Sequence, residues 1–382
     1  MSGVRVAFII DSLKLGGAER VLLSWASWCR EEGWNVLVIT RHGPERDAYP
    51  VPEGVDRWVE PKLPLFLDRL GWLAFPLRLL ALRKLLRRHC SDVVVGMTTL
   101  PSVKVLLASV GLSTRVVVSE RNYPPAKPPS LPWRWLRRIT YPRADLHLVQ
   151  TAPTGVWLRD HCAVTRQRLL PNPVSWPLPN REPVVLPEDC LAADHPLILA
   201  AGTKAFQKGF DRLMPMFAEL GQRSSSLHLA LLGLAPGRYH GHDQQAELRR
   251  ALGDHPDLQQ RLLMPGVSGS MASWYERATV FVLPSRYEGF PNVLLEAMAA
   301  GCACIASDCL TGPSDLIRHG ENGVLMPPQA STDAWVDAIQ ALLIDSDYRR
   351  RLGARAATVR ERYAPQHLRR DFLKALRPLR HG

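Results

Sequence analysis

The sequence predicts an α/β protein built from two successive domains, and two observations support this. Short β-branched runs alternate with helical patterns along most of the 382 residues, which is typical of a parallel sheet covered by helices on both faces. A stretch with seven prolines, residues 171–196, interrupts the alternation, as a connection between domains does. We therefore predict an N-terminal domain at 1–180, a C-terminal domain at 181–364 and an amphipathic helix within 365–382.

Each predicted element follows from its local pattern. In the first domain we expect strands at 4–10, 35–40, 92–96, 115–119 and 146–150, and helices at 18–32 and 71–89. In the second we expect strands at 197–202, 227–232, 262–264, 280–283 and 304–307, and helices from 210, at 244–252, from 292, at 331–343 and at 348–363. Ligands of such sheets bind beyond the carboxyl ends of the strands, so the site is expected in a cleft between the domains.

Composition excludes several classes of protein. With 46% apolar and 22% charged residues, the chain has the make-up of a globular protein. Its apolar runs end before the ~18 residues that a membrane span needs. The N-terminus shows no secretory pattern. The seven cysteines lack the paired spacings of a zinc site, and we interpret them as small buried residues in a reducing cytoplasm.

Three loops carry candidate binding residues. Gly16 and Gly17 follow the first strand and precede a helix, which suits either an anion site or a purely structural turn. Lys204 and Lys208 follow the first strand of the second domain, where an ammonium group is suited to phosphate oxygens or is simply solvated.

The third loop is the most specific of the three. Glu288 and Glu296 lie eight residues apart, on either side of a turn that opens a helix near Asn292. Helix-start N–H groups favour anions, while carboxylates accept hydrogen bonds from sugar hydroxyls. The alternative, one helix-start acid and one exposed acid, does not explain why the two bracket a turn.

These motifs, with Gly312-Pro313 and Asn322-Gly323, resemble glycosyltransferase family 4 in order and in spacing. The resemblance covers essentially the whole chain and implies the GT-B fold, in which two Rossmann-like domains face each other across a cleft. It also implies a retaining glycosyltransferase whose donor is a nucleotide sugar, and a C-terminal helix that returns to the N-terminal domain.

The resemblance assigns roles residue by residue. Glu288 and Lys208 would act at the transferred sugar and the diphosphate, and Glu296 would hold the ribose. The expected donor-binding residues are Gly16, Gly17, Lys204, Lys208, Gly289, Phe290, Pro291, Asn292, Val293 and Glu296. Two departures concern cations and the catalytic base. Thr203 stands where the family usually has an arginine, so Lys204 would supply the second cation. Glu120 and Arg121 stand near the place of the usual histidine and are the remaining catalytic candidates.

One further motif is interpreted as structural. Asp345-Ser346-Asp347 matches the D-x-D of metal-dependent transferases of another fold. It links two polar helices here instead of following an apolar strand, so no metal is expected. The charge of the leaving group is met more plausibly by Lys208, helix dipoles and backbone amides.

Basic residues are concentrated in two windows of the first half. Residues 61–90 and 115–143 each carry seven basic residues and one acid, and together they account for the whole formal charge of +12. Leu63 to Arg88 and Trp133 to Arg138 combine leucine and tryptophan with arginine, a pattern typical of helices that lie in lipid headgroups. The alternative is that the leucines of the first segment pack against the first sheet, and this explains part of the pattern. No nucleic-acid module is recognisable.

We therefore predict a cytoplasmic enzyme at the inner face of the cytoplasmic membrane. It would move a hexose or N-acetylhexosamine from a nucleotide sugar to a lipid-linked saccharide for surface polysaccharide. The nucleotide is expected to be UDP because residues 308–315 resemble the version seen in relatives that use UDP-hexoses or UDP-N-acetylhexosamines. The alternatives are an epimerase or phosphorylase of the same fold, and a non-catalytic nucleotide-sugar-binding membrane partner.

Overall fold

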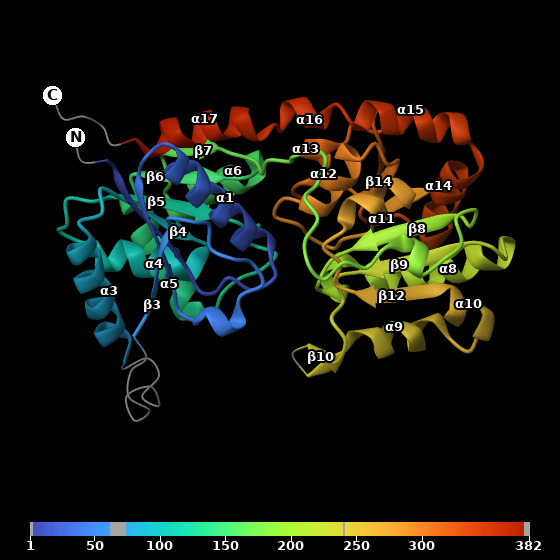
Figure 1. Cartoon of the computed structure of the whole chain (residues 1–382), viewed down its shortest axis with the longest axis horizontal. Coiled ribbons are helices and arrows are strands. Elements are labelled where there is room, and N and C mark those ends of the chain that lie inside the picture. The colour runs from blue at the N-terminus through green and yellow to red at the C-terminus, as the bar shows by residue number, and fades with distance from the viewer. Residues whose placement is uncertain (1–2, 62–73, 240, 378–382) are drawn as a thin grey trace. The chain divides into compact units, whose positions relative to one another are not determined.

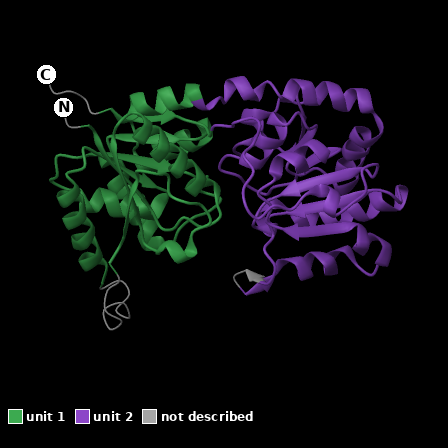
Figure 2. Cartoon of the chain, in the orientation of Figure 1, with its two compact units in different colours: residues 1–172, 366–382 green, residues 173–365 purple. Residues whose placement is uncertain are grey.

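The computed structural model describes residues 3–61, 74–239 and 241–377. The chain forms two compact units, residues 1–172 with 366–382 and residues 173–365 (Figure 2). The sequence placed the boundary at 180, whereas the structure places it at 172. The proline-rich segment belongs to the second unit because its backbone is bonded there: Val174 N–H donates to the Tyr363 carbonyl, and Arg181 N–H donates to the Gly269 carbonyl.

Unit 1 contains a parallel sheet in the order β3-β2-β1-β4-β5-β6-β7 (Figure 1). Its strands are β1 (Arg5–Ile10), β2 (Asn35–Thr40), β3 (Asp56–Val59), β4 (Val93–Met97), β5 (Arg115–Glu120), β6 (Leu146–Val149) and β7 (Gln167–Leu169). The central strand β1 pairs on both sides, with Phe8 opposite Val38 of β2 and Val95 of β4. All three side chains are fully buried, as expected for a parallel sheet covered on both faces.

The helices of unit 1 are α1 (Gly17–Glu31), α3 (Phe75–His89), α4 (Thr99–Ala108), α5 (Leu131–Thr140), α6 (Ala152–Cys162) and α17 (Pro365–Leu376), with short 3-10 turns η1 (Pro44–Arg46) and η3 (Tyr141–Arg143). Helix α4 is buried on most of its surface, and α3 buries only one apolar stripe, formed by Leu82, Leu85 and Leu86. Of the segment from Leu63 to Arg88, which the sequence predicts to contact lipid, residues 63–73 lie outside the described residues.

Helix α17, although last in the chain, packs on the first helix of unit 1. The ring of Phe372 is fully buried and stacks on Trp25 of α1, with 4.5 Å between ring centroids. On the same helix Arg369 pairs with Glu32 at 3.2 Å, and Asp371 pairs with Arg168 at 3.1 Å. Buried aromatic area supplies most of such an interface, and the exposed ion pairs add little.

Unit 2 contains a second parallel sheet in the order β12-β9-β8-β13-β14-β15. Its strands are β8 (Leu197–Ala201), β9 (His228–Leu232), β12 (Leu262–Gly266), β13 (Val280–Leu283), β14 (Cys304–Ser307) and β15 (Val324–Met326), and β10 (Arg238–Tyr239) pairs with β11 (His242–Asp243). Its helices are α7 (Ala205–Lys208), α8 (Phe210–Arg223), α9 (Gln244–Leu252), α10 (Pro256–Arg261), α11 (Met271–Arg277), α12 (Asn292–Ala299), α13 (Pro313–Leu316), α14 (Thr332–Ile344), α15 (Ser346–Ala356) and α16 (Val359–Arg362), with the turn η4 (Pro187–Asp189).

The cysteines do not form a metal site in the part of the chain that the structure describes. Five are buried, Cys190 is partly buried and Cys90 is exposed. Burial raises the pKa of the Cys309 thiol to about 12, so this side chain behaves as a small apolar group at neutral pH. Among the described residues no helix is both long and apolar enough to cross a membrane.

Candidate active site

The candidate site lies at the carboxyl edge of the second sheet. Strand β13 pairs in parallel with β8 on one side and β14 on the other, with Phe281 opposite Leu199 and Cys304. The loops after these three strands therefore leave the sheet at the same edge, where ligands of open α/β sheets bind. Lys208 follows β8, Glu288 follows β13, and the residues up to Gly312 follow β14.

Lys208 and Glu288 form the ion pair at the centre of this edge. The Lys208 Nζ lies 2.7 Å from the Glu288 Oε1, and the two side chains are only 13% and 5% exposed. Ser285 Oγ donates to the same oxygen at 2.6 Å. One of the three ammonium N–H groups thus goes to Glu288, and an ammonium group can donate two further hydrogen bonds.

Two glycines allow this close arrangement. A Cβ at Gly202 would lie 2.6 Å from the Lys208 Cγ, so the lysine side chain passes directly over the glycine. Gly209 ends α7 with φ at +69°, and a Cβ there would overlap the carbonyl oxygen of Pro284. A side chain at either position would push the lysine segment away from the loop after β13.

Glu296 lies in α12 and is buried. Tyr275 of α11 donates its hydroxyl hydrogen to the Glu296 Oε2 at 3.2 Å. The first-turn N–H of Val293 has no acceptor within the helix, as at every helix start. Pro291 is among the residues expected to bind the sugar donor, but its nitrogen carries no hydrogen, so it cannot donate a backbone hydrogen bond to a ligand. The Asn292 N–H donates to the Phe290 carbonyl at 3.0 Å.

The loop after β14 joins the same cluster. Thr311 donates its hydroxyl hydrogen to the Glu288 carbonyl, and a Cβ at Gly312 would lie 2.5 Å from the Pro291 Cδ. The sequence did not predict the contacts of Thr311, Ser285 or Tyr275. For Ser285 a signal existed, since it stands three residues before Glu288 in the same motif.

The two remaining catalytic candidates, Glu120 and Arg121, lie in unit 1. Glu120 ends β5 and is buried; Tyr141 and Thr99 donate hydroxyl hydrogen bonds to it at 2.9 and 3.2 Å. Burial raises the pKa of the Glu120 carboxyl above its ordinary value. Burial also lowers the pKa of the Arg121 guanidinium to about 9, and Arg121 donates to the Asn172 side chain. Both side chains are thus built into the core of unit 1.

The glycine pair stands at the start of α1 in unit 1, and Lys204 directly precedes α7 in unit 2. Helix α1 begins at Gly17, with Gly16 extended before it. The Lys204 carbonyl accepts the Lys208 N–H at 3.0 Å, which closes the single turn of α7. The structure therefore gathers Lys204, Lys208, Glu288 and the start of α12 at one sheet edge.

The D-x-D segment has a structural explanation. Asp345 caps α15, its Oδ1 accepting the Tyr348 N–H at 2.8 Å, and Asp347 pairs with Arg350 one turn later. Such capping is the ordinary role of aspartate before a helix.

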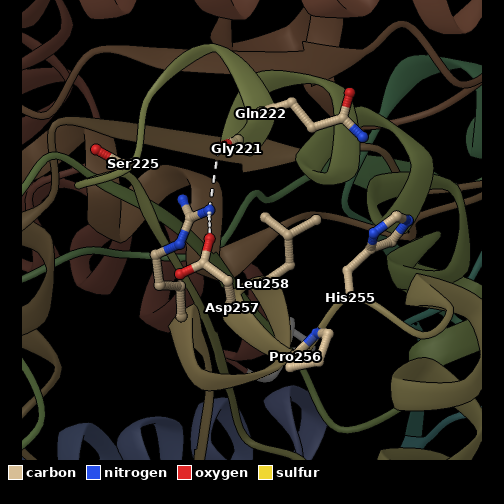
Figure 3. Close-up of a pocket in the computed structure, with 8 residues that line it drawn as sticks. Gly221, Gln222, Ser225, His255, Pro256, Asp257 and Leu258 are labelled. Carbon is tan, nitrogen blue, oxygen red and sulfur yellow. Dashed lines mark hydrogen bonds and ion pairs between the residues drawn. The ribbon is translucent and has the colours of Figure 1, made fainter.

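A separate pocket of unit 2, with a volume of about 290 Å³, lies between the end of α8 and α10 (Figure 3). Arg261 donates to the carbonyls of Gly221, Ser224 and Leu227 and pairs with Asp257 at 2.5 Å. The Arg261 side chain therefore connects the end of α8 with α10.

Two family models match the chain, one for each unit. The model described as Glycosyltransferase Family 4 matches residues 15–175, and the one described as Glycosyl transferases group 1 matches residues 195–345. The chain belongs to glycosyltransferase family 4. It is a glycosyltransferase with the GT-B fold, so the fold and family expected from the sequence are confirmed.

This glycosyltransferase is similar to two curated relatives in sequence and to one solved structure in fold. It is 26% identical to the "GalNAc-alpha-(1->4)-GalNAc-alpha-(1->3)-diNAcBac-PP-undecaprenol alpha-1,4-N-acetyl-D-galactosaminyltransferase" of Campylobacter jejuni over 98% of both chains. It is 28% identical to an exopolysaccharide phosphotransferase of Streptomyces coelicolor over 74% of its own length, which spans only 28% of that relative. The structure of Anabaena HepE with UDP and glucose superposes with a TM-score of 0.82 and 18% identity, covering 98% of this chain and 100% of HepE.

Proposed function

We propose that this glycosyltransferase transfers a hexose or N-acetylhexosamine from a UDP-sugar to a lipid-linked saccharide, with retention of configuration. The observation that carries the proposal is the buried Lys208–Glu288 pair at the sheet edge, next to the start of α12. It combines a cation for phosphate with a carboxylate for hydroxyl groups. The UDP and glucose held by HepE and the undecaprenol-linked acceptor in the Campylobacter relative's name support the two substrate classes.

Each residue contributes one interaction to this proposed reaction. Lys208 and the N–H groups at the start of α12 stabilise the negative charge that develops on the leaving diphosphate. Glu288 accepts hydrogen bonds from the transferred sugar, and Glu296 accepts them from the ribose. The acceptor hydroxyl attacks on the face that the diphosphate leaves: the new C1–O bond forms, the C1–O–phosphate bond breaks, and the proton passes to the departing phosphate. No metal is required in this scheme.

Binding of UDP tests the donor assignment. Replacing Glu296 with alanine is expected to weaken UDP binding by about 10-fold or more, since a hydrogen bond to a charged group contributes about 1.5–3 kcal/mol. UDP should raise the thermal midpoint of the wild type and raise that of the variant less. GDP and ADP serve as competing nucleotides.

Glu321→Ala is the matched control, because Glu321 is an exposed acid of the same unit. Equal UDP shifts for wild type and Glu296→Ala would contradict the assignment of the ribose site. Sugar transfer that needs an added acceptor separates the proposal from an epimerase, which converts labelled donor alone.

We also propose that α5 of unit 1 contacts an anionic membrane surface. Leu131, Trp135 and Ile139 recur every four residues and are exposed, Trp135 by 63%. Arg134 and Arg138 lie between them and are exposed too. A helix with such a face lies in lipid headgroups, with each cation contributing about 1 kcal/mol near anionic lipid.

The structure corrects one part of the sequence argument. The sequence predicts that Trp133, within the segment from Trp133 to Arg138, lies at the lipid surface. Its ring instead meets Phe75 of α3 edge-on, with 5.5 Å between centroids, and contacts the core of unit 1. Of the two tryptophans of α5, Trp135 is therefore the one that is available to lipid.

Vesicle flotation tests the membrane proposal. Trp135→Ser is expected to reduce binding to phosphatidylglycerol-containing vesicles by about 10-fold, because burial of a large apolar side chain contributes about 1.5–3 kcal/mol. Trp58→Ser, an exposed tryptophan on β3, should bind as the wild type does. Equal flotation on pure phosphatidylcholine, or no effect of Trp135→Ser, would argue against the proposal.

A further inference from the structure

The loop after β13 is fastened to the α7 segment by more than the Lys208–Glu288 pair. The Arg286 N–H donates to the Gln207 carbonyl at 2.9 Å, and the Gln207 side-chain amide donates to the Tyr287 carbonyl at 3.3 Å. These bonds join Gln207, which directly precedes Lys208, to Arg286 and Tyr287, the two residues before Glu288. The relative position of the two loops therefore sets the distance between ammonium and carboxylate.

The Arg286 side chain adds the strongest of these connections. Its two terminal nitrogens each lie 2.6 Å from one oxygen of Asp211, in the first turn of α8. One of them also donates to the Phe206 carbonyl at 2.7 Å, and the guanidinium lies 4.0 Å from the centre of the Phe206 ring. One side chain thus holds residues on both sides of Lys208.

The geometry depends on the planar fork of arginine. A carboxylate that accepts two parallel N–H bonds fixes both distance and orientation, which a lysine ammonium cannot reproduce. The hydrogen bonds and charge of Asp211 raise the pKa of Arg286, and those of Arg286 lower the pKa of Asp211. Both groups therefore stay charged throughout the neutral range.

We propose that Arg286 is a positioning residue of the donor site, which holds the α7 segment at the height where Lys208 meets Glu288 and the diphosphate. The inference rests on the proposed function for its ligand. Arg286 acts through Lys208, because its terminal nitrogens already donate to Asp211 and Phe206. The exposed ring of Phe206 serves here as the surface on which the guanidinium lies.

Hydrogen–deuterium exchange tests the connection without any ligand. In Arg286→Gln and Arg286→Lys we expect faster exchange in peptides covering 204–209, whose amides close the α7 turn, and unchanged exchange in α15. Arg350→Gln is the matched control, since it removes another Arg–Asp pair of the same unit. Unchanged exchange at 204–209 in both Arg286 variants would overturn the inference.

Titration with UDP tests the consequence for the site. Arg286→Lys is expected to raise the Kd for UDP, and the KM for the sugar donor, by about 10-fold, equal to about 1.4 kcal/mol, with a smaller change in kcat. The charge-swapped variant Arg286→Asp with Asp211→Arg should recover part of the affinity. Wild-type affinity in Arg286→Lys would overturn the role.

The two proposals fail in different ways. A wild type that binds none of UDP, GDP and ADP would contradict the proposed function, while exchange at 204–209 would still decide whether Arg286 holds the segment. Normal UDP binding with faster exchange in Arg286→Lys would overturn the positioning role and leave the donor class intact.

Discussion

Replacing Lys208 with methionine is expected to lower the rate of sugar transfer by about 10²–10³-fold. Methionine is one atom shorter and keeps most of the apolar stem, but it removes the cation that we propose faces the leaving diphosphate. Losing one such electrostatic contact in an active site has an effect of this size. The measurement is kcat and KM with a labelled nucleotide sugar and excess acceptor. Transfer within a few-fold of the wild type would show that the charge is supplied elsewhere.

The same change also affects stability, and this must be separated from catalysis. Removing one partner of a buried pair costs about 3–5 kcal/mol, because the other charge stays buried without compensation. Glu288 is that other charge. The double variant Lys208→Met with Glu288→Gln should regain much of the stability, measured by urea unfolding, but none of the activity. Recovery of activity in the double variant would mean that the single variant fails only by misfolding.

The second large effect is expected for Phe372→Ala in α17. Truncating a fully buried aromatic side chain costs about 3–5 kcal/mol, and Phe372 stacks on Trp25 and contacts Trp28. The unfolding transition of unit 1, followed by tryptophan fluorescence, should shift to lower urea concentration, while that of unit 2 should not.

Leu80→Ala is the matched control for Phe372. Leu80 lies on α3 and is 61% exposed, so its truncation should change the free energy of unfolding by less than about 0.5 kcal/mol. A Phe372→Ala variant as stable as Leu80→Ala would show that α17 contributes little to unit 1.

The interior strands were predictable, but of the four edge strands only β12 was predicted. Strands such as β1 and β13 are buried on both faces, so they read as continuous apolar runs. In unit 2, β15 at a sheet edge and the short pair β10 and β11 were missed. In unit 1 the missed strands are β3 and β7, at the two edges of the sheet. Half-exposed and containing charged residues, they lack that pattern. Periodicity reports burial, and edge strands are only partly buried.

The site was predictable as far as local motifs reach. Glu288 and Glu296 stand in one motif, and the strand order explains why Lys208, far away in sequence, joins them. The pairing of Arg286 with Asp211 joins residues 75 positions apart, and no local pattern encodes it. Trp133 shows the same limit, because only the position of α3 reveals which helix face it covers.

The placement of α17 bears on how the protein is made. Unit 1 needs residues from both ends of the polypeptide, so a ribosome must translate the whole of unit 2 before Trp25 can acquire its aromatic neighbour. One face of the N-terminal sheet therefore stays incompletely covered during most of the synthesis of the chain. A premature stop codon just upstream of α17 would leave unit 2 intact but would expose the apolar surface of unit 1 that α17 covers. Chaperones and proteases recognise such exposed apolar surface.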